Sequence, residues 1–278
     1  MKILFILLIA GGLIILAFSE KKVSWLAIGD SITYLNDHTN ETGNRVTKGY
    51  LSRVVEKLPQ LNYINQGHNG WTVIRMAQQI EKIGLVKADV YSVFLGTNDW
   101  WHSERLGTFA DYQNTSGNQT VYGAYRIIIN KIRSLNPEAK VILVTPMQRS
   151  DFVYINNPKN NAYGSYKAKD GQQLADFAKA VDTIAQYEKF ELVDLYNKSK
   201  ITQKNLVNFK RLKDPATGQY KNYRYPDFTQ IPFNPETDEY PYPAEAINMT
   251  YDGLHPSDKG NQRIADLVIK AMKNVLRK

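Results

Sequence analysis

The sequence predicts a three-layer α/β/α sandwich, in which helices cover both faces of a central parallel sheet. Two observations lead to this fold class. Apolar runs of strand length alternate along the chain with segments whose apolar residues recur at helical spacing. The strand-length runs are continuously apolar, which is typical of parallel strands buried on both faces. In such sheets ligands bind beyond the carboxyl ends of the strands, so we expect the functional residues in the turns that follow them.

Each element has its own signal. The expected strands are short, rich in β-branched or aromatic residues, and mostly end at Gly, Asn or Pro; they are 23–28, 61–65, 90–95, 141–145 and 190–194. The expected helices lie between and after these strands, at 49–58, 71–83, 120–135, 171–189 and 258–276. One α/β domain of this size is ordinary, so we expect residues 20–278 to form a single domain.

One segment, about 208–247, interrupts the alternation. It is rich in tyrosine and asparagine and contains six prolines, a density that argues against a long helix or a central strand. The tyrosines can bury surface, which argues against disorder. We therefore expect an ordered Tyr/Pro-rich insertion, with a hairpin, that packs near the functional site.

The N-terminus has the pattern of an export signal. Met1-Lys2 precedes an apolar run, 3–18, and the polar segment 19–22 follows it. Ala17 and Ser19 supply small residues at the −3 and −1 positions of a signal-peptidase site. The run is slightly short for a membrane-spanning helix. We expect residues 1–19 to be a cleaved signal peptide of an exported protein, the alternative being a retained membrane anchor.

Composition limits the partners. The chain has no cysteine, which excludes a lipoprotein attachment, disulfides and a thiolate metal site. Its net charge of +8 arises from scattered lysines and arginines rather than from a dense basic block, and no nucleic-acid-binding motif is present. We expect no nucleic-acid partner, while affinity for an acidic polysaccharide stays open.

Four motifs stand at or near the predicted strand ends and before the last helix. In order they are Gly29-Asp30-Ser31, the glycine-bearing turn 65–70, Gly96-Thr97-Asn98-Asp99, and the pair Asp252 and His255. Together they resemble the SGNH (GDSL-type) hydrolase superfamily of serine esterases, over about residue 23 to the C-terminus. The resemblance implies a flavodoxin-like SGNH hydrolase fold with a five-stranded parallel sheet, and hydrolysis of carboxylic esters.

The motif residues also suggest this chemistry directly. A serine hydroxyl becomes a good nucleophile when a base removes its proton, and an imidazole is suited to that role near neutral pH. We assign these parts to Ser31 and His255, and expect Asp252 to accept the imidazole Nδ1–H. The alternative is that Asp252 only caps a helix and His255 lies at the surface. Asp30 and Asp99 are expected to be structural.

The oxyanion of an acyl-transfer reaction needs hydrogen-bond donors. By resemblance these are the backbone N–H groups of Ser31 and Gly70 and the side-chain amide of Asn98. Gly67 competes with Gly70, which we prefer because it directly precedes the expected helix 71–83, where N–H groups are free.

Metal and cofactor chemistry is not expected. The other histidines, His38, His68 and His102, show no metal-ligand spacing with Asp or Glu, and cysteine ligands are absent. The G-x-S-x-G elbow of α/β-hydrolases is also absent, which argues against that serine-esterase scaffold.

Aromatic residues flank the motif turns and suggest the substrate. Trp71, Trp100 and Trp101 could stack on a sugar or line an acyl slot, with core packing as the alternative. The insertion adds further aromatic candidates: Tyr223, Tyr225, Tyr240 and Tyr242. We expect an esterase that hydrolyses short-chain esters, above all O-acetyl groups on carbohydrate. The substrate is expected to be a small molecule or a polysaccharide. The alternatives are a lysophospholipase, thioesterase or generalist esterase, and a non-catalytic glycan-binding protein on the same scaffold.

Overall fold

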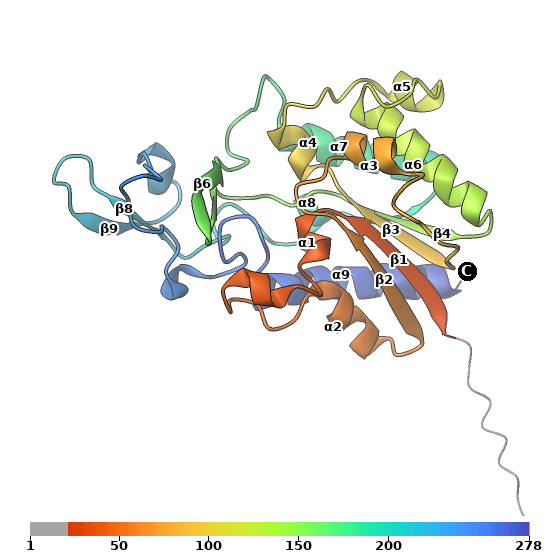
Figure 1. The fold of residues 1–278 in the computed structure, drawn as a ribbon, viewed down its shortest axis with the longest axis horizontal. Coiled ribbons are helices and arrows are strands. Elements are labelled where there is room, and N and C mark those ends of the chain that lie inside the picture. The colour runs from red at the N-terminus through yellow and green to blue at the C-terminus, as the bar shows by residue number, and fades with distance from the viewer. Residues whose placement is uncertain (1–21, 278) are drawn as a thin grey trace, which may run out of the picture.

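A computed structural model describes residues 22–277; the segment 1–19, expected to be a signal peptide, lies outside them. A five-stranded parallel sheet forms the centre, with the strand order β2-β1-β3-β4-β7 (Figure 1). Its strands are β1 (Val23–Gly29), β2 (Leu61–Gly67), β3 (Val90–Phe94), β4 (Lys140–Val144) and β7 (Glu191–Val193). The register pairs Gly29 with Gly67 and with Phe94, and Phe94 with Val144. The carboxyl ends of four strands are therefore level, and the turns that follow them are neighbours.

Helices cover both faces of the sheet, which confirms the predicted fold class. On one face lie α2 (Tyr50–Lys57) and α9 (Asp258–Arg277), and on the other α3 (Val73–Gln79), α6 (Val121–Leu135) and α7 (Leu174–Glu188) (Figure 1). Successive strand residues enter different cores: Trp25 and Ala27 pack with α2 and α9, whereas Leu26 and Ile28 pack with α3 and α6. Both faces of β1, β3 and β4 are mostly buried, which explains why these strands are largely apolar, whereas the edge strand β2 is partly exposed and carries Asn62, Asn65 and Gln66.

Short helical turns connect the larger elements: α1 (Ser31–Tyr34), η1 (Thr39–Thr42), α4 (Thr97–Trp101), α5 (Phe109–Gln113) and α8 (Leu195–Lys198). Helix α3 is shorter than the helix predicted at 71–83. The Thr72 side chain accepts a hydrogen bond from the N–H of Arg75 and caps the helix, so α3 begins at Val73 and Trp71 lies before it.

Two antiparallel hairpins extend beyond the sheet. The first, β5 (Phe152–Tyr154) with β6 (Asn157–Ala162), lies in a stretch for which the sequence predicted no element. The second, β8 (Lys210–Lys213) with β9 (Tyr220–Tyr223), belongs to the Tyr/Pro-rich segment and is followed by η2 (Asp227–Gln230) and η3 (Ala244–Ala246). This segment forms a small apolar cluster with Val153 of the first hairpin. The two hairpins lie at the same side of the molecule (Figure 1).

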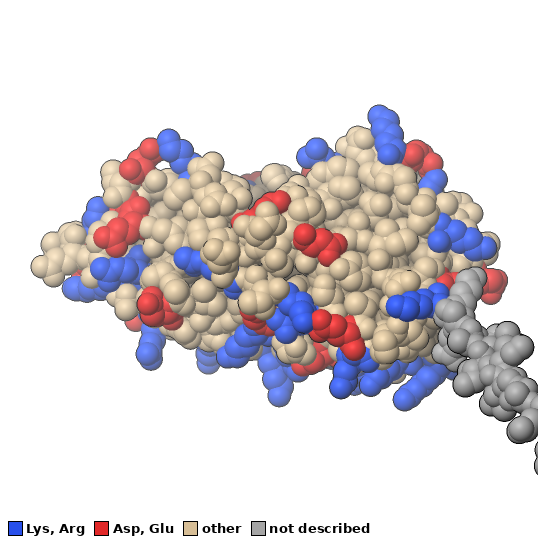
Figure 2. Space-filling view, turned by 60° about the horizontal axis from the view of Figure 1, so that its bottom comes forward, with Lys and Arg blue, Asp and Glu red and all other residues tan. Residues whose placement is uncertain are grey.

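The surface agrees with the charge pattern of the sequence. Figure 2 shows lysines and arginines scattered over one view of the molecule, most densely along its lower edge, with acidic side chains between them. Within residues 22–277, no helix combines the length and the apolar character that a membrane crossing requires.

Candidate active site

Ser31 lies at the start of α1, directly after β1. Asp30 is the N-cap of this helix, and its Oδ1 accepts the N–H of Ile32 at 2.9 Å, the structural role expected for it. Ser31 is therefore the first helical residue, whose N–H has no acceptor within the helix. Burial raises the pKa of Asp30 to about 6, against the opposing effects of the Ile32 N–H and of the nearby His255 and Arg149.

The structure brings His255, 224 residues further along the chain, to Ser31, together with Asp252 of the same turn. Ser31 Oγ lies 2.8 Å from His255 Nε2, and His255 Nδ1 lies 2.6 Å from Asp252 Oδ2. Asp252 is completely buried, and its Oδ1 accepts the N–H groups of Leu254 and His255 at 3.0 and 2.7 Å. With Nδ1–H donating to Asp252, Nε2 is the acceptor for the Ser31 hydroxyl, the tautomer that a general base requires.

The turn after β2 distinguishes its two glycines. A Cβ on Gly67 would stand 2.1 Å from the backbone N of Tyr34, so the absence of a side chain here lets α1 pack on the sheet. The N–H of Gly67 donates to Asn65 Oδ1 and is therefore already used. Gly70 instead lines a cleft with a φ of +72°, and no acceptor among residues 22–277 takes its N–H. We expected Gly70 to precede the helix directly. It does not, because Thr72 caps α3 and Val73 is the first residue of that helix.

The turn after β3 places Asn98 in the same cleft and Asp99 beneath it. Asn98 Nδ2 donates to the carbonyl of Trp71 at 3.0 Å, which fixes the amide against the Gly70 turn. Both carboxylate oxygens of Asp99 accept the N–H of Val73, at 2.9 and 3.0 Å, so Asp99 is structural, as expected. Burial raises the pKa of Asp99 to about 7, although the N–H of Val73 opposes the shift.

These residues surround a cleft of about 300 Å³. Ser31, Gly70, Asn98 and His255 all line it, whereas Asp252 lies buried behind His255. The remaining wall is of mixed character: polar Glu41, Asn69, His102, Arg149 and Asn160, and apolar or aromatic Leu35, Trp101, Phe152, Tyr154, Ala162, Tyr251 and Leu254. A second depression shares Gly70 and His102 with this cleft, and its other lining residues are almost all polar.

The tryptophan predictions need correction. Of the three, only Trp101 lines the cleft. Trp100 is fully buried in the core, where its Nε1–H donates to the carbonyl of Gln172, so its prediction as a substrate-binding residue was wrong. Trp71 stacks on His68, outside the cleft lining. The tyrosines of the insertion, 223, 225, 240 and 242, do not line the cleft either.

The turn that carries Asp252 and His255 is held on one side by the segment 150–153. The N–H of Ser150 donates to the carbonyl of Gly253 at 2.8 Å, and that of Val153 to the carbonyl of Asp252 at 3.2 Å. Asp151, between them, is bound through its Oδ2 to Lys210 Nζ at 2.7 Å and through its backbone carbonyl to the hydroxyl of Tyr242. The Tyr/Pro-rich segment thus contributes to the site indirectly, by fixing this turn.

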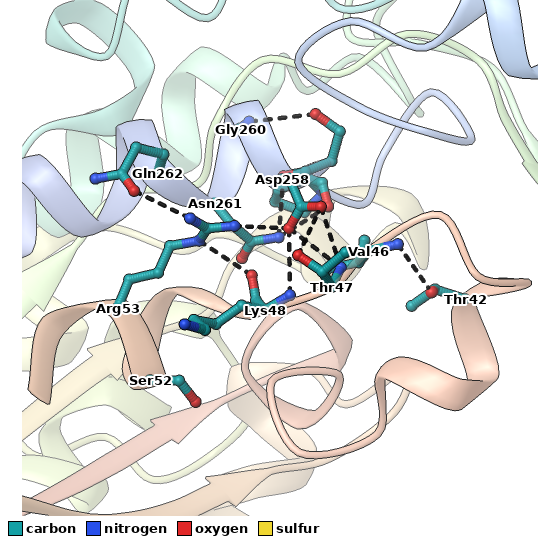
Figure 3. Close-up of polar contacts among 12 residues, drawn as sticks. Thr42, Val46, Thr47, Lys48, Ser52, Arg53, Asp258, Gly260, Asn261 and Gln262 are labelled. Atoms are coloured by element: carbon teal, nitrogen blue, oxygen red, sulfur yellow. Dashed lines mark hydrogen bonds and ion pairs between the residues drawn. The ribbon is translucent and has the colours of Figure 1, made fainter. Parts of the chain in front are cut away.

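Asp258 holds the other side of the same turn. Its carboxylate accepts hydrogen bonds from Thr47 and from the N–H of Lys48, and pairs with Arg53 of α2 at 2.6 Å (Figure 3). The pKa of Asp258 lies below its ordinary value. Burial alone would raise this pKa, but the hydrogen bonds from Thr47 and Lys48 and the charge of Arg53 outweigh the effect of burial. The hydroxyl of the preceding Ser257 accepts the N–H of Gly260, as the side chain of an N-cap residue does. Figure 3 shows Asp258 between Arg53 and the Thr47-Lys48 loop, so α9 starts at a fixed place two residues after His255-Pro256.

Two parts of the cleft wall were not predicted from the sequence. One is the β5–β6 hairpin, which contributes Phe152, Tyr154, Asn160 and Ala162. Its signal is the aromatic and β-branched triplet 152–154 before the turn-forming Asn156-Asn157-Pro158. The other is Arg149, in the turn after β4, where the strand-end rule could have found it. As for metals, no group of three or more His, Cys, Asp or Glu within the described part of the chain could hold an ion.

Comparisons with known proteins agree with this geometry. The model of the GDSL-like lipase/acylhydrolase family matches residues 27–263. A crystal structure described as a possible lipase from Chitinophaga pinensis is 61% identical, covers 91% of this chain and 99% of its own, and superposes with a TM-score of 0.91. No protein of curated function matches the sequence.

Two more distant structures share the fold. A protein from Lactobacillus plantarum is 18% identical over 91% of this chain and 98% of its own, with a TM-score of 0.61. An acetyl xylan esterase is 20% identical over 90% of this chain and 99% of its own, with a TM-score of 0.54.

Proposed function

The chain belongs to the GDSL-like lipase/acylhydrolase family and is a carboxylic ester hydrolase, and we propose that it removes short acyl groups through an acyl-serine intermediate. Within this activity we propose O-acetyl groups on carbohydrate as the preferred substrate. The observation that carries the first proposal is the chain of hydrogen bonds from Ser31 through His255 to Asp252, which opens into the cleft.

The proposed reaction begins when Ser31 Oγ attacks the ester carbonyl carbon and His255 Nε2 takes the hydroxyl proton. Asp252 accepts Nδ1–H and stabilises the imidazolium that forms. The imidazolium then protonates the leaving alcohol, which departs and leaves an acyl-serine. A water molecule, deprotonated by His255, attacks the carbonyl carbon of this second ester. The imidazolium then returns the proton to Ser31 Oγ as the acyl–oxygen bond breaks, which releases the carboxylic acid and restores the Ser31 hydroxyl.

Three donors are proposed to stabilise the oxyanion of both tetrahedral intermediates. They are the N–H of Ser31, free at the start of α1, the N–H of Gly70, and the amide of Asn98. Asn98 Nδ2 carries two hydrogens, and only one is used in the bond to Trp71.

The shape and polarity of the surroundings support a small acyl group on a hydroxylated alcohol. The cleft is small, and the depression that continues from it past Gly70 and His102 is lined by four amide side chains, Gln78, Gln79, Asn118 and Gln119. Amides both donate and accept hydrogen bonds, as sugar hydroxyls require. The partly exposed Trp101 can stack on a sugar face.

A lipolytic activity is the second candidate. It is favoured by the apolar part of the cleft wall, Leu35, Phe152 and Leu254, and by the 61% identical structure described as a possible lipase. A series of p-nitrophenyl esters from acetate to octanoate separates the two. The acetylesterase proposal predicts the highest kcat/KM for acetate, whereas a maximum at octanoate would support the lipolytic candidate instead.

Replacing the nucleophile tests the catalytic assignment. We expect Ser31→Ala to reduce hydrolysis of p-nitrophenyl acetate at least about 10³-fold, because catalysis would then rest on the oxyanion donors and binding alone. Ser134→Ala, an exposed serine of α6, is the control and should keep full activity. An unchanged rate in the Ser31 variant would show that another nucleophile acts.

Export and domain organisation complete the proposal. We propose that residues 1–19 direct export and are cleaved after Ser19, leaving one folded domain from residue 20 onward. The intact mass of the secreted protein checks the cleavage site. A mass that includes residues 1–19 would favour the retained anchor.

A further inference from the structure

Arg149 occupies the fourth strand-end position of the sheet. The turns after β1, β2 and β3 place Ser31, Gly70 and Asn98 in the cleft, and the turn after β4 places Arg149 there. The proposed reaction leaves this residue without a role.

The guanidinium group of Arg149 is buried and pairs with no carboxylate of residues 22–277. Arg149 is 1% exposed, and its enclosed Nε and Nη2 have no hydrogen-bond partner among these residues. Other buried cations do have carboxylate partners: the buried Lys210 pairs with Asp151, and the mostly buried Arg126 pairs with Glu188. A buried charge costs free energy unless it is paired, so an unpaired guanidinium at a cleft indicates that its partner comes from outside.

The group is nevertheless held in place and charged. Its plane lies near the rings of Trp100 and Trp101, with Cζ 5.5 and 5.7 Å from the ring centroids. The backbone of Arg149 is fixed by Ser165 and by Gln203, whose Nε2 donates to its carbonyl at 2.7 Å. Burial lowers the pKa of Arg149 to about 10, while the charges of Asp252, Asp151 and Asp30 oppose the shift, so it stays a cation at neutral pH.

We propose that Arg149 binds a carboxylate carried by the substrate, so that the preferred substrate is an acyl ester of an acidic sugar. A guanidinium N–H donates a strong, charge-assisted hydrogen bond to a carboxylate oxygen, and Nη1 is the guanidinium nitrogen that is not enclosed. Trp101, which contacts Arg149, lines the same wall, so a sugar stacked on this ring brings its carboxylate toward the cation. The other charged lining residue, Glu41, would repel an anion and favour the Arg149 end. This inference rests on the proposed esterase function and specifies its substrate.

The test compares two substrates that differ in charge. Monoacetylated methyl glucuronoside carries the carboxylate, and monoacetylated methyl glucoside lacks it. We expect the wild type to prefer the glucuronoside in kcat/KM, and Arg149→Met to reduce that preference about 10- to 100-fold, the range for a hydrogen bond to a charged group. Arg149→Lys should restore part of it, and the exposed Arg211→Met should leave it unchanged.

The neutral substrate p-nitrophenyl acetate separates this inference from the proposed function. If the wild type hydrolyses it, and Arg149→Met does so within a few-fold, the esterase is intact and the loss of preference is specific. Equal kcat/KM for both sugars in the wild type, or an equal loss for every substrate in Arg149→Met, would overturn the carboxylate site. Absence of wild-type turnover would instead contradict the proposed function.

A competition experiment keeps the inference testable if the variant does not fold. Glucuronate should inhibit wild-type hydrolysis of p-nitrophenyl acetate at concentrations where glucose does not. Equal inhibition by the two sugars would overturn the proposal. Inhibition by methyl phosphate but not by glucuronate would overturn it too, and would indicate a phosphate-bearing ester such as a lysophospholipid.

Discussion

The two halves of the site hold the carboxylates that support the catalytic residues in different ways. On the nucleophile side, Asp30 and Asp99 cap short helices at strand ends, and the hydrogen bonds found for them come from backbone N–H groups. Burial dominates there, and both pKa values are raised. On the base side, Asp151 and Asp258 bind cations and hydroxyls of segments distant in sequence.

This difference reflects how each half is built. The strand-end turns are local: the sheet brings them together, and neutral donors a few residues away are sufficient. The Asp252–His255 turn belongs to no strand, and it is fixed by Lys210 and Tyr242 of the insertion and by Asp258 on α9. Removing one partner of a charge pair on the base side should therefore cost more folding stability than removing a helix cap on the nucleophile side.

The largest expected effect is on the base side, at Asp252. Asp252→Asn replaces the acceptor Oδ2 by an amide, which would donate to Nδ1 and leave Nε2 protonated and unable to accept the Ser31 proton. We expect kcat for p-nitrophenyl acetate to fall on the order of 10⁴-fold. Stopped-time assays with purified protein measure it.

The control for this variant is Asp266→Asn, an exposed carboxylate on α9 that accepts from Gln262. It should keep wild-type kcat. If Asp252→Asn were to stay within tenfold of wild type, the serine would not depend on the imidazole tautomer, and the base side would have no special role.

The next effect is on folding stability, at Lys210. This residue is 1% exposed and its Nζ lies 2.7 Å from Asp151 Oδ2. Lys210→Met leaves Asp151 without its cation, and we expect the free energy of unfolding to fall by about 3–5 kcal/mol. Urea denaturation followed by fluorescence measures the change.

Lys221→Met is the matched control, because Lys221 pairs with Asp214 in the same insertion but is half exposed. Exposed pairs contribute about 0–1 kcal/mol, so this variant should be close to wild type. Equal losses in the two lysine variants would contradict the view that the insertion stabilises the site through the buried pair.

The same contrast explains what the sequence could predict. The five strands, the helices between them and the turns with Ser31, Gly70 and Asn98 follow from apolar periodicity and from the strand-end rule, which are local signals. Asp252 and His255 were identified only as a motif. Nothing in the sequence shows that Asp151 and Lys210 would meet 59 residues apart to hold that turn.

The predictions that were wrong, and the features that were not predicted, also have physical causes. Trp100 and Trp101 are adjacent, and the helical turn of α4 points one into the core and the other into the cleft, which spacing alone does not decide. The β5–β6 hairpin has strands of three and six residues, the second almost entirely polar, so it lacks the periodicity of a sheet strand. Arg149 follows a predicted strand, but whether a guanidinium is paired depends on tertiary contacts.

The smallest expected effect, taken per pH unit, tests the nucleophile side, through the pH dependence of Asp99. Its pKa is raised from the ordinary 3.8 to about 7, so between these values the folded protein retains a proton that the unfolded chain has released. The stabilisation is therefore complete below about pH 4 and declines as pH rises toward 7, by at most about 1.4 kcal/mol per pH unit. Asp99→Asn cannot titrate, and comparison with it removes the contribution of other carboxylates. We expect the unfolding free energy of the wild type, measured in urea at pH 4, 5, 6 and 7, to fall relative to Asp99→Asn as pH rises. Parallel curves, or a wild type that gains on the variant, would mean that Asp99 is ionised in the fold and that both halves of the site hold charged carboxylates alike.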